Sequence, residues 1–305
     1  MKPPIRYVEH EDIDPGKWDA CISNASNGVI YGYSFYLDHM AKHWDALILG
    51  DYEAVMALPW NSKYGIGYVY QPAFTMCCGV FGNNLTEALI GHFIQAIPKK
   101  FKLIEINLSA GNVFSIPSGF DQLQSNYTLS LKPAYQELYS NYKENIKRNI
   151  KKAQQLGCTI TTGIPVHDVI LLAKQQLQSL VKIAGHDFQQ FEKLYEHLHR
   201  QQRANTYGVF SAAGELIASC VFFFSHNRAY YILVGNHPNG KTAGASHYLI
   251  DRFIADHAGH DMILDFEGSD IQSLAFFYSS FGAKWEAYPA IRINRLPWYV
   301  RLFKR

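Results

Sequence analysis

The amino-acid sequence predicts an α/β protein with mixed sheets, built from two copies of one unit. Three observations support this prediction: short apolar runs of strand length are joined by turn residues, an amphipathic helix follows them, and a further apolar strand follows the helix. This order occurs within residues 47–131 and again within residues 207–283. We therefore expect two domains, residues 1–133 and residues 134–305, with the active site in the second.

In the first half, the expected elements are helices at 18–21 and 33–43, strands at 47–49, 54–58, 64–70 and 74–81, a helix at 86–97, and strands at 103–108 and 120–131. In the second half, they are strands at 207–210, 216–224 and 229–234, a helix at 246–258, a strand at 262–266, and a helix that ends at Gly282. Gly50-Asp51 and Ala213-Gly214 supply the hairpin turns.

An internal repeat supports the two copies. Leu89-Ile90-x-x-Phe93-Ile94 aligns without gaps with Leu249-Ile250-x-x-Phe253-Ile254, and residues 104–106 then fall on residues 264–266. Any amphipathic helix followed by a strand would match a few apolar positions. The acidic position also matches, Glu105 on Asp265, and this favours a duplicated unit.

Composition limits the class of protein. Of 305 residues, 48% are hydrophobic and 18% charged, which is typical of a globular chain with a sizeable core. The net charge of +2 is too small for a large nucleic-acid footprint, and no DNA partner is expected. Five cysteines without metal-ligand spacing predict reduced thiols, no metal site and a cytoplasmic location. No secretion signal and no membrane-spanning run is found.

Two carboxylates follow the strand at 262–266. If that strand is regularly pleated, Asp265 and Glu267 point to one face at its carboxyl end, where open parallel sheets bind ligands. Asp265 could instead cap the loop that follows.

The segment 133–157 is predicted to be one amphipathic helix. Its basic face, which contains Arg148 and Lys152, is either a solvated surface or a platform for an anionic substrate or phosphate. Arg148 is the best candidate donor because its planar fork matches phosphate oxygens.

These motifs carry a family resemblance. Tyr142-x5-Arg148-Asn149-Ile150-x-Lys152-Ala153-x3-Gly157, Asp265-Phe266-x-Gly268 and Phe277-Tyr278-x2-Phe281-Gly282 resemble the tandem-GNAT group, which includes the Fem peptidoglycan aminoacyltransferases and FemAB-like acyltransferases of bacteria. The resemblance implies two tandem GNAT-like domains, each with two parallel strands that splay apart, and an acyl donor in the gap.

In ordinary GNAT enzymes the donor is acyl-CoA, whose pyrophosphate lies on a glycine-rich loop at a helix N-terminus. The matching segment here is Asn236 to Ser246, in which the expected cofactor-binding residues are Asn236, Gly240, Gly244, Ala245 and Ser246. The usual Arg or Gln start and the Gly-x-Gly pair are absent. The alternative is a glycine turn capped by Ser246 without a ligand.

The chemistry implied is direct attack of an amine on a thioester or ester. An amine with a pKa near 10.4 costs about 4 to 5 kcal/mol to deprotonate at neutral pH, so a base is needed. Glu267 is the first candidate base, Asp265 the second, and His247 a third. Tyr278 matches the leaving-group acid of many GNAT enzymes, but it could be a core tyrosine, and Phe277 is expected to contact substrate.

Three functions remain open from the sequence. The protein could transfer an acyl group from acyl-CoA to an amine acceptor, transfer an aminoacyl group from tRNA to a peptidoglycan-precursor-like amine as Fem enzymes do, or bind ligands without catalysis. The small net charge disfavours tRNA. The aromatic and basic residues 296–305 could touch a membrane surface weakly, although a tail that packs on its own domain is the simpler interpretation.

Overall fold

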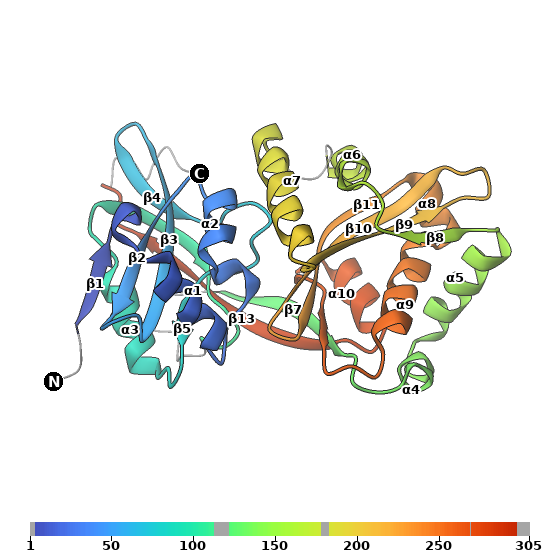
Figure 1. Ribbon diagram of the computed structural model, residues 1–305, viewed down its shortest axis with the longest axis horizontal. Helices are drawn as coiled ribbons and strands as arrows, with labels where there is room; N and C mark the ends of the chain where they lie inside the picture. Colours follow the sequence, from blue (N-terminus) through green and yellow to red (C-terminus); the bar gives the residue numbers. More distant parts are fainter. Residues whose placement is uncertain (1–3, 113–121, 178–182, 269, 298–305) are drawn as a thin grey trace. The chain divides into compact units, whose positions relative to one another are not determined.

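The computed structural model describes residues 4–112, 122–177, 183–268 and 270–297, and the chain divides into two compact units (Figure 1). Unit 1 comprises residues Met1–Gln124 and Ala287–Arg305, and unit 2 comprises Ser125–Glu286. The chain passes from unit 1 to unit 2 within strand β7 (Gln122–Ser130) and returns within β13 (Lys284–Asn294). The expected division at residues 133/134 did not include this return, because an apolar pattern does not show which sheet a strand joins.

Unit 1 is a mixed sheet between helices. Its elements are β1 (Ile5–Val8), α1 (Pro15–Asn24), α2 (Ser34–Met40), β2 (His43–Leu49), β3 (Ala54–Lys63), β4 (Ile66–Tyr70), β5 (Val80–Gly82), α3 (Glu87–Ala96) and β6 (Phe101–Asn107), with two short 3-10 turns. The strand order is β1-β2-β3-β4-β6-β13, in which only β4 and β6 run parallel. Helix α3 buries Ile90 and Phe93 in a core with strand residues such as Leu47 and Met56.

Unit 2 repeats the arrangement. After β7 come α4 (Tyr135–Ser140), α5 (Glu144–Gln155), β8 (Thr159–Thr162), α6 (Val166–Leu177), α7 (Gly185–Arg200), β9 (Ala204–Phe210), β10 (Leu216–Ser225), β11 (Arg228–Asn236), α8 (Pro238–Ala243), α9 (Ala245–His257), β12 (Ile263–Asp265) and α10 (Gln272–Ser279). The strand order is β7-β12-β11-β10-β9-β8. Helices α5 and α9 cover one face of this sheet, and α6 and α7 cover the other (Figure 1).

The duplicated order of elements predicted from the sequence is present. In unit 1, two antiparallel pairs (β2-β3 and β3-β4) lead through α3 to β6, which lies parallel to β4. In unit 2, β9-β10 and β10-β11 lead through α9 to β12, which lies parallel to β11. Two tandem GNAT-like domains therefore describe the fold.

Aromatic packing stabilises the core of unit 2. Phe222 of β10 stacks on Phe253 of α9 with ring centroids 3.7 Å apart, and Phe253 also stacks on His257 at 4.2 Å. Such pairs contribute about 0.5–1.5 kcal/mol beyond their buried area. They fix α9, and with it the loop that precedes α9, against the sheet.

Two predicted elements differ from the structure. The strand expected at 74–81 is confined to β5 and a single parallel bridge at Cys78. The helix expected at 133–157 is broken between α4 and α5, because the Lys143 amide donates to the Ser280 carbonyl at 2.9 Å instead of continuing the helix. Helices α6, α7 and α8 were not predicted.

Candidate functional site

The candidate site of unit 2 lies where β11 and β12 separate. The two parallel strands pair only from Arg228 to Tyr230 and from Ile263 to Asp265, while β11 continues to Asn236. Ile232 is the extra residue of a β-bulge opposite β10, and such a bulge bends the strand that carries it. The divergence leaves the end of β11 without β12 as a neighbour.

The segment after β11 is a short helix and not an open glycine loop. Gly240 lies in α8, where an added Cβ would come 2.0 Å from the Ile217 carbonyl oxygen. Gly244 ends α8 with a φ of +79°, and a Cβ there would come 2.6 Å from the Asn149 carbonyl oxygen. Both glycines are thus explained by close packing against β10 and α5.

The other expected cofactor-binding residues also have internal contacts. The Ser246 hydroxyl donates to the Asn236 side-chain oxygen, and the backbone N–H of Asn236 donates to Gln176 Oε1 at 2.6 Å. Ala245 is fully buried at the start of α9. In the structure these residues precede or begin helix α9, and the bond between Ser246 and Asn236 holds the segment between β11 and α9 in place.

Asp265 is sealed in the protein. Its side chain is fully buried, its Oδ2 lies 2.5 Å from Arg228 Nη1, and its Oδ1 accepts the Glu267 amide at 2.9 Å. The latter is the contact expected if Asp265 caps the following loop. A carboxylate paired this closely with a guanidinium is poorly placed to accept a proton from a substrate.

Glu267 lies on a constrained turn beyond the end of β12. Glu267 has a φ of +65° and Gly268 has a φ of +77°, and the strand ends at Asp265. The prediction that Asp265 and Glu267 share one face required a regular pleat through both residues, and that pleat does not extend to Glu267. The turn is held on both sides, since the Glu267 amide donates to Asp265 and the Gly268 amide donates to Asn126 Oδ1 at 2.8 Å. A non-glycine residue in the left-handed region costs about 1–3 kcal/mol and is enriched at functional sites.

A row of side chains on α10 extends from this turn. Tyr278 is buried and stacks on Phe266 at 4.6 Å; burial, and then the charge of Glu267, raise its pKa, so the carboxylate and the phenol lie near each other. The Phe277 ring lies 5.6 Å from that of Tyr278 and 4.9 Å from that of His247. Three predicted site residues thus adjoin one another, with Phe277 in the middle.

His247 is a neutral imidazole. Burial lowers its pKa from 6.5 to about 4, its Nδ1 is buried without a partner among the described residues, and its Nε2 lies 3.4 Å from Asn149 Nδ2. Accepting a proton would create a buried charge on His247. Protonation of Glu267 would remove a charge instead, which makes Glu267 the better acceptor.

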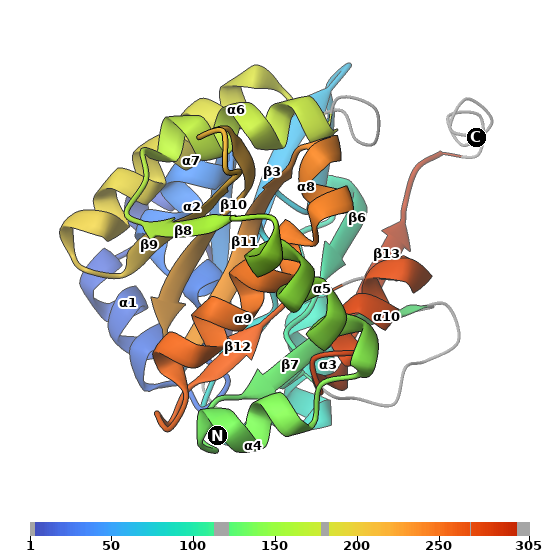
Figure 2. The same cartoon turned by 90° about the vertical axis from the view of Figure 1, so that its right-hand side faces the viewer.

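Helix α5 lies beside this cluster, which its Asn149 contacts. Figure 2 shows α5 alongside α9 and α10, in agreement with the contact of Asn149 with His247. Lys147 pairs with Glu144 at 3.1 Å, and Lys143 lies 4.7 Å from the Phe276 ring centroid. Arg148 and Lys152 are exposed, and no contact among the described residues ties them to the cluster.

Two residues of the site, Asn126 and Arg228, were missed from the sequence, and Asn149 was part of a motif but was given no role. Arg228 also lies 3.5 Å from Glu286, and Asn126 is fully buried. A lone arginine at the start of the apolar strand 229–234 was the one available signal, because a charge entering a core requires a partner. The asparagines act through contacts distant in sequence.

The equivalent gap in unit 1 is filled by its own chain. Past the β4-β6 pairing, the Asn107 amide donates to Gln71 Oε1 at 2.9 Å, and the Cys78 amide donates to the Asn107 carbonyl at 2.8 Å. The segment between Gln71 and Cys78 thus lies against the end of β6. In unit 1, the position beyond the paired strands is therefore occupied by this segment.

Within the described ranges, no helix is long and apolar enough to cross a membrane. The same residues contain no group of three or more histidine, cysteine or acidic side chains that could hold a metal ion. All five cysteines are free thiols. The C-terminal segment considered for membrane contact lies outside the described residues from 298 onward.

A mixed sheet whose parallel strands diverge beside a helix N-terminus defines the GNAT class of acyltransferase fold. Residues 140–270 match the family model described as an acetyltransferase (GNAT) domain. The matched segment contains two of the motifs on which the sequence resemblance rested and agrees with that resemblance.

Among solved structures, FemX is similar over 98% of this chain and 100% of its own, with a TM-score of 0.68 and 12% identity. L-PGS from Bacillus licheniformis gives a TM-score of 0.55 at 11% identity, with 95% of each chain covered. Saccharomyces cerevisiae N-myristoyltransferase with bound myristoyl-CoA gives 0.51 at 10% identity, covering 95% of this chain and 79% of that chain. At such identities the likeness shows the fold alone. No curated protein sequence matches the chain.

Proposed function

We propose that the protein is an N-acyltransferase that moves an acyl group from a thioester or ester donor, in the gap between β11 and β12, to an amine acceptor by direct attack. The observation that carries this proposal is that the pairing of those strands ends at Tyr230 and Asp265, at a position that in unit 1 is occupied by the segment between Gln71 and Cys78. Glu267, at the end of β12 beside the gap, accepts the proton from the attacking amine. The amine nitrogen forms a bond to the carbonyl carbon, and the donor's oxygen or sulfur leaves.

Roles for the neighbouring residues follow from their environment. Asp265, Arg228 and Asn126 position the Glu267 turn and do not touch substrate. Burial, and then the charge of Glu267, raise the pKa of Tyr278, so it remains protonated and can supply the proton for the leaving group. Phe277 and neutral His247 provide an apolar wall, which favours the unprotonated form of the amine.

Replacement of Glu267 tests this assignment. Glu267→Gln keeps the size of the side chain and removes the base, so we expect transfer to an amine to fall about 100-fold or more, with unchanged Tm. Glu137→Gln on the exposed face of α4 is the matched control. Wild-type transfer rates in the Glu267 variant would exclude it as the base.

The carrier of the acyl group is a second question. Packing of Gly240 and Gly244 accounts for both glycines without a phosphate, and this weighs against a CoA cradle. The exposed cations Arg148 and Lys152 of α5 favour a polyanionic carrier. We therefore consider a tRNA-linked aminoacyl donor, with a peptidoglycan-precursor-like amine as acceptor, at least as well supported as acyl-CoA.

Two binding measurements separate the carriers. A rise in Tm with acetyl-CoA would support CoA, and salt-sensitive binding of charged tRNA would support the Fem-type reaction. For tRNA, the affinity falls as salt rises, and the double variant Arg148→Ala with Lys152→Ala should make the slope of log affinity against log salt less steep by roughly 1–2. Lys193→Ala with Arg200→Ala on α7 removes the same charge from the other face as a control. If neither donor binds, the result would favour the third function, a protein that binds ligands without catalysis.

A further inference from the structure

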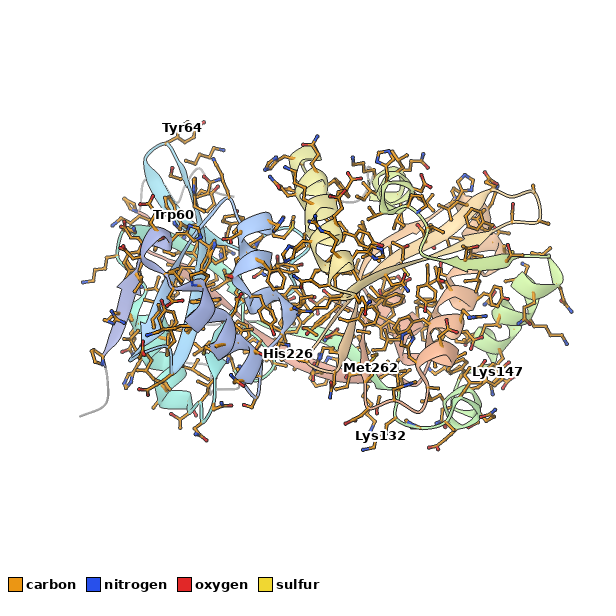
Figure 3. All side chains as sticks on the ribbon, in the orientation of Figure 1. Trp60, Tyr64, Lys132, Lys147, His226 and Met262 are labelled. Carbon is orange, nitrogen blue, oxygen red and sulfur yellow. The ribbon has the colours of Figure 1, made fainter. Side chains whose placement is uncertain are left out.

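We propose that unit 1 contains a second site, which binds a small alkylammonium ion. The site is a cavity of about 450 Å³ lined by Glu9, Asp38, Trp44, Asp45, Trp60 and Lys100, among others. These residues come from the ends of β1, α2, β2 and β3 and from the residue before β6, and Trp60 is seen on β3 in Figure 3. The inference is independent of acyl transfer, because it uses residues of unit 1 alone.

The ammonium group of Lys100 marks where a cation is stable. Lys100 Nζ lies 4.6 Å from the ring centroid of Tyr7, 5.3 Å from that of Phe101 and 5.7 Å from that of Trp60. All three distances are within the range of cation–π attraction. The carboxylates of Asp45 and Glu9 lie 3.8 and 3.9 Å from the same nitrogen, too far for direct hydrogen bonds.

The cavity favours positive charge. Glu9, Glu11, Asp38 and Asp45 line it against two lysines, Lys42 and Lys100. Asp45 is buried and oriented by two donors, the Tyr7 hydroxyl and the His10 amide. A carboxylate fixed in this way attracts a cation without the cost of ordering its side chain.

The ring-rich lining selects an organic cation. Asp38 Oδ1 already accepts Trp44 Nε1 at 2.8 Å and lies 3.0 Å from His10 Nε2, which leaves few free oxygens for a divalent metal. Trp60 Nε1 is buried without a partner among the described residues, and its ring stacks on His43 at 4.8 Å. Alkyl groups can lie on these rings while the nitrogen takes the position of Lys100 Nζ.

Lys100 is a displaceable occupant of this site. Its side chain is 48% exposed, and its flexible stem can carry the ammonium into water with a gain in rotamer freedom. An external ammonium ion therefore competes with Lys100. Removal of this lysine should strengthen binding of a cation, whereas removal of a lysine from an anion site would weaken binding.

Calorimetric titration of the full chain with n-butylammonium chloride tests the proposal, with sodium chloride at equal ionic strength as the blank. We expect saturable binding that becomes about tenfold tighter in Lys100→Met and weaker in Glu9→Gln. Trp60→Leu should also bind more weakly, and the far-UV circular dichroism and Tm of each variant establish folding. Lys99→Met, which removes the neighbouring charge, is the matched control.

Equal or weaker butylammonium binding in Lys100→Met would overturn the proposal, as would an absence of saturable binding in both proteins. The same titrations with inorganic phosphate test the opposite polarity. Phosphate binding that is lost in Lys100→Met would identify an anion site and would also overturn it. None of these outcomes bears on the Glu267 variant, so acyl transfer and ammonium binding succeed or fail separately.

Discussion

At the scale of single residues, Asp265 and Glu267 differ more than their spacing of two suggests. Asp265 is sealed against Arg228, while Glu267 is partly exposed on a turn with positive φ. Sequence alone predicted that carboxylates occur at this strand end. It could not assign their separate roles, because those roles depend on Arg228 and Asn126, which approach from distant parts of the chain.

Removing one partner of the buried ion pair should be costly. Asp265→Ala leaves Arg228 charged, mostly buried and without its closest partner, so we expect the free energy of unfolding to fall by about 3–5 kcal/mol. Urea denaturation measures the change. Glu105→Ala, which breaks the exposed Arg292–Glu105 pair, should cost no more than about 1 kcal/mol. Similar losses in both variants would contradict a structural role for Asp265.

Burial of His247 predicts a dependence of stability on acid. Its pKa is about 4 in the folded protein and 6.5 when exposed, so the unfolded chain binds the proton more tightly between these values. The stability contribution is complete above pH 6.5 and falls by about 1.4 kcal/mol per pH unit down to pH 4. In His247→Phe this fall should be absent. Parallel curves of Tm against pH for the two proteins would refute the assignment.

At the scale of elements, α8 determines the structure of the segment that was expected to bind the acyl donor. The residues expected to form an open glycine loop fold into a turn of helix, fixed by Gly240 against β10 and by Gly244 against α5. The sequence shows that glycines occur in this segment, but it does not show why. Glycine is required both where two backbones approach closely and where a backbone binds a phosphate, so the sequence alone does not distinguish the two.

Two glycine substitutions distinguish packing from intrinsic helix preference. Gly240→Ala should destabilise the protein by about 1–3 kcal/mol, because the new methyl group meets the Ile217 carbonyl. Gly91→Ala lies in α3, where a Cβ meets nothing within 4 Å, and should stabilise by about 0.5–1 kcal/mol. Thermal unfolding measures both. A neutral or stabilising Gly240→Ala would mean that α8 is not packed as described.

The same scale shows where sequence periodicity succeeds and fails. Helix α3 begins within one residue of its predicted start, and Thr86 Oγ1 caps it by accepting the Leu89 amide at 3.2 Å. The hairpins of both units also form at the turn residues that predicted them. Local signals suffice for such elements. The helix predicted at 133–157 was broken by a tertiary bond from Lys143 to Ser280, which no local pattern contains.

At the scale of the whole molecule, the two units differ in continuity. Unit 2 is one uninterrupted segment, residues 125–286, whereas unit 1 needs β13 from beyond that segment. In unit 1, residues 290–294 of β13 pair with residues 103–107 of β6, so a chain that stops at residue 124 leaves β6 with an unpaired edge.

Fragments should reflect this difference. We expect residues 125–286 to unfold cooperatively on their own, because their core is formed within the segment. Residues 1–124 alone should aggregate through the open edge of β6, and joining residues 284–297 to them by a flexible linker should restore cooperative unfolding. Analytical ultracentrifugation and thermal melts measure both properties. Equal behaviour of 1–124 with and without β13 would show that the strand is dispensable.

The return of β13 to unit 1 also has a consequence during synthesis. The residues of unit 1 that precede β7 are translated before unit 2, but their sheet is finished last, because its final strand, β13, is translated only after the whole inserted segment. The nascent N-terminal half must therefore stay competent to fold while the later domain completes itself, and chaperones that shield exposed strand edges are the natural partners for that interval.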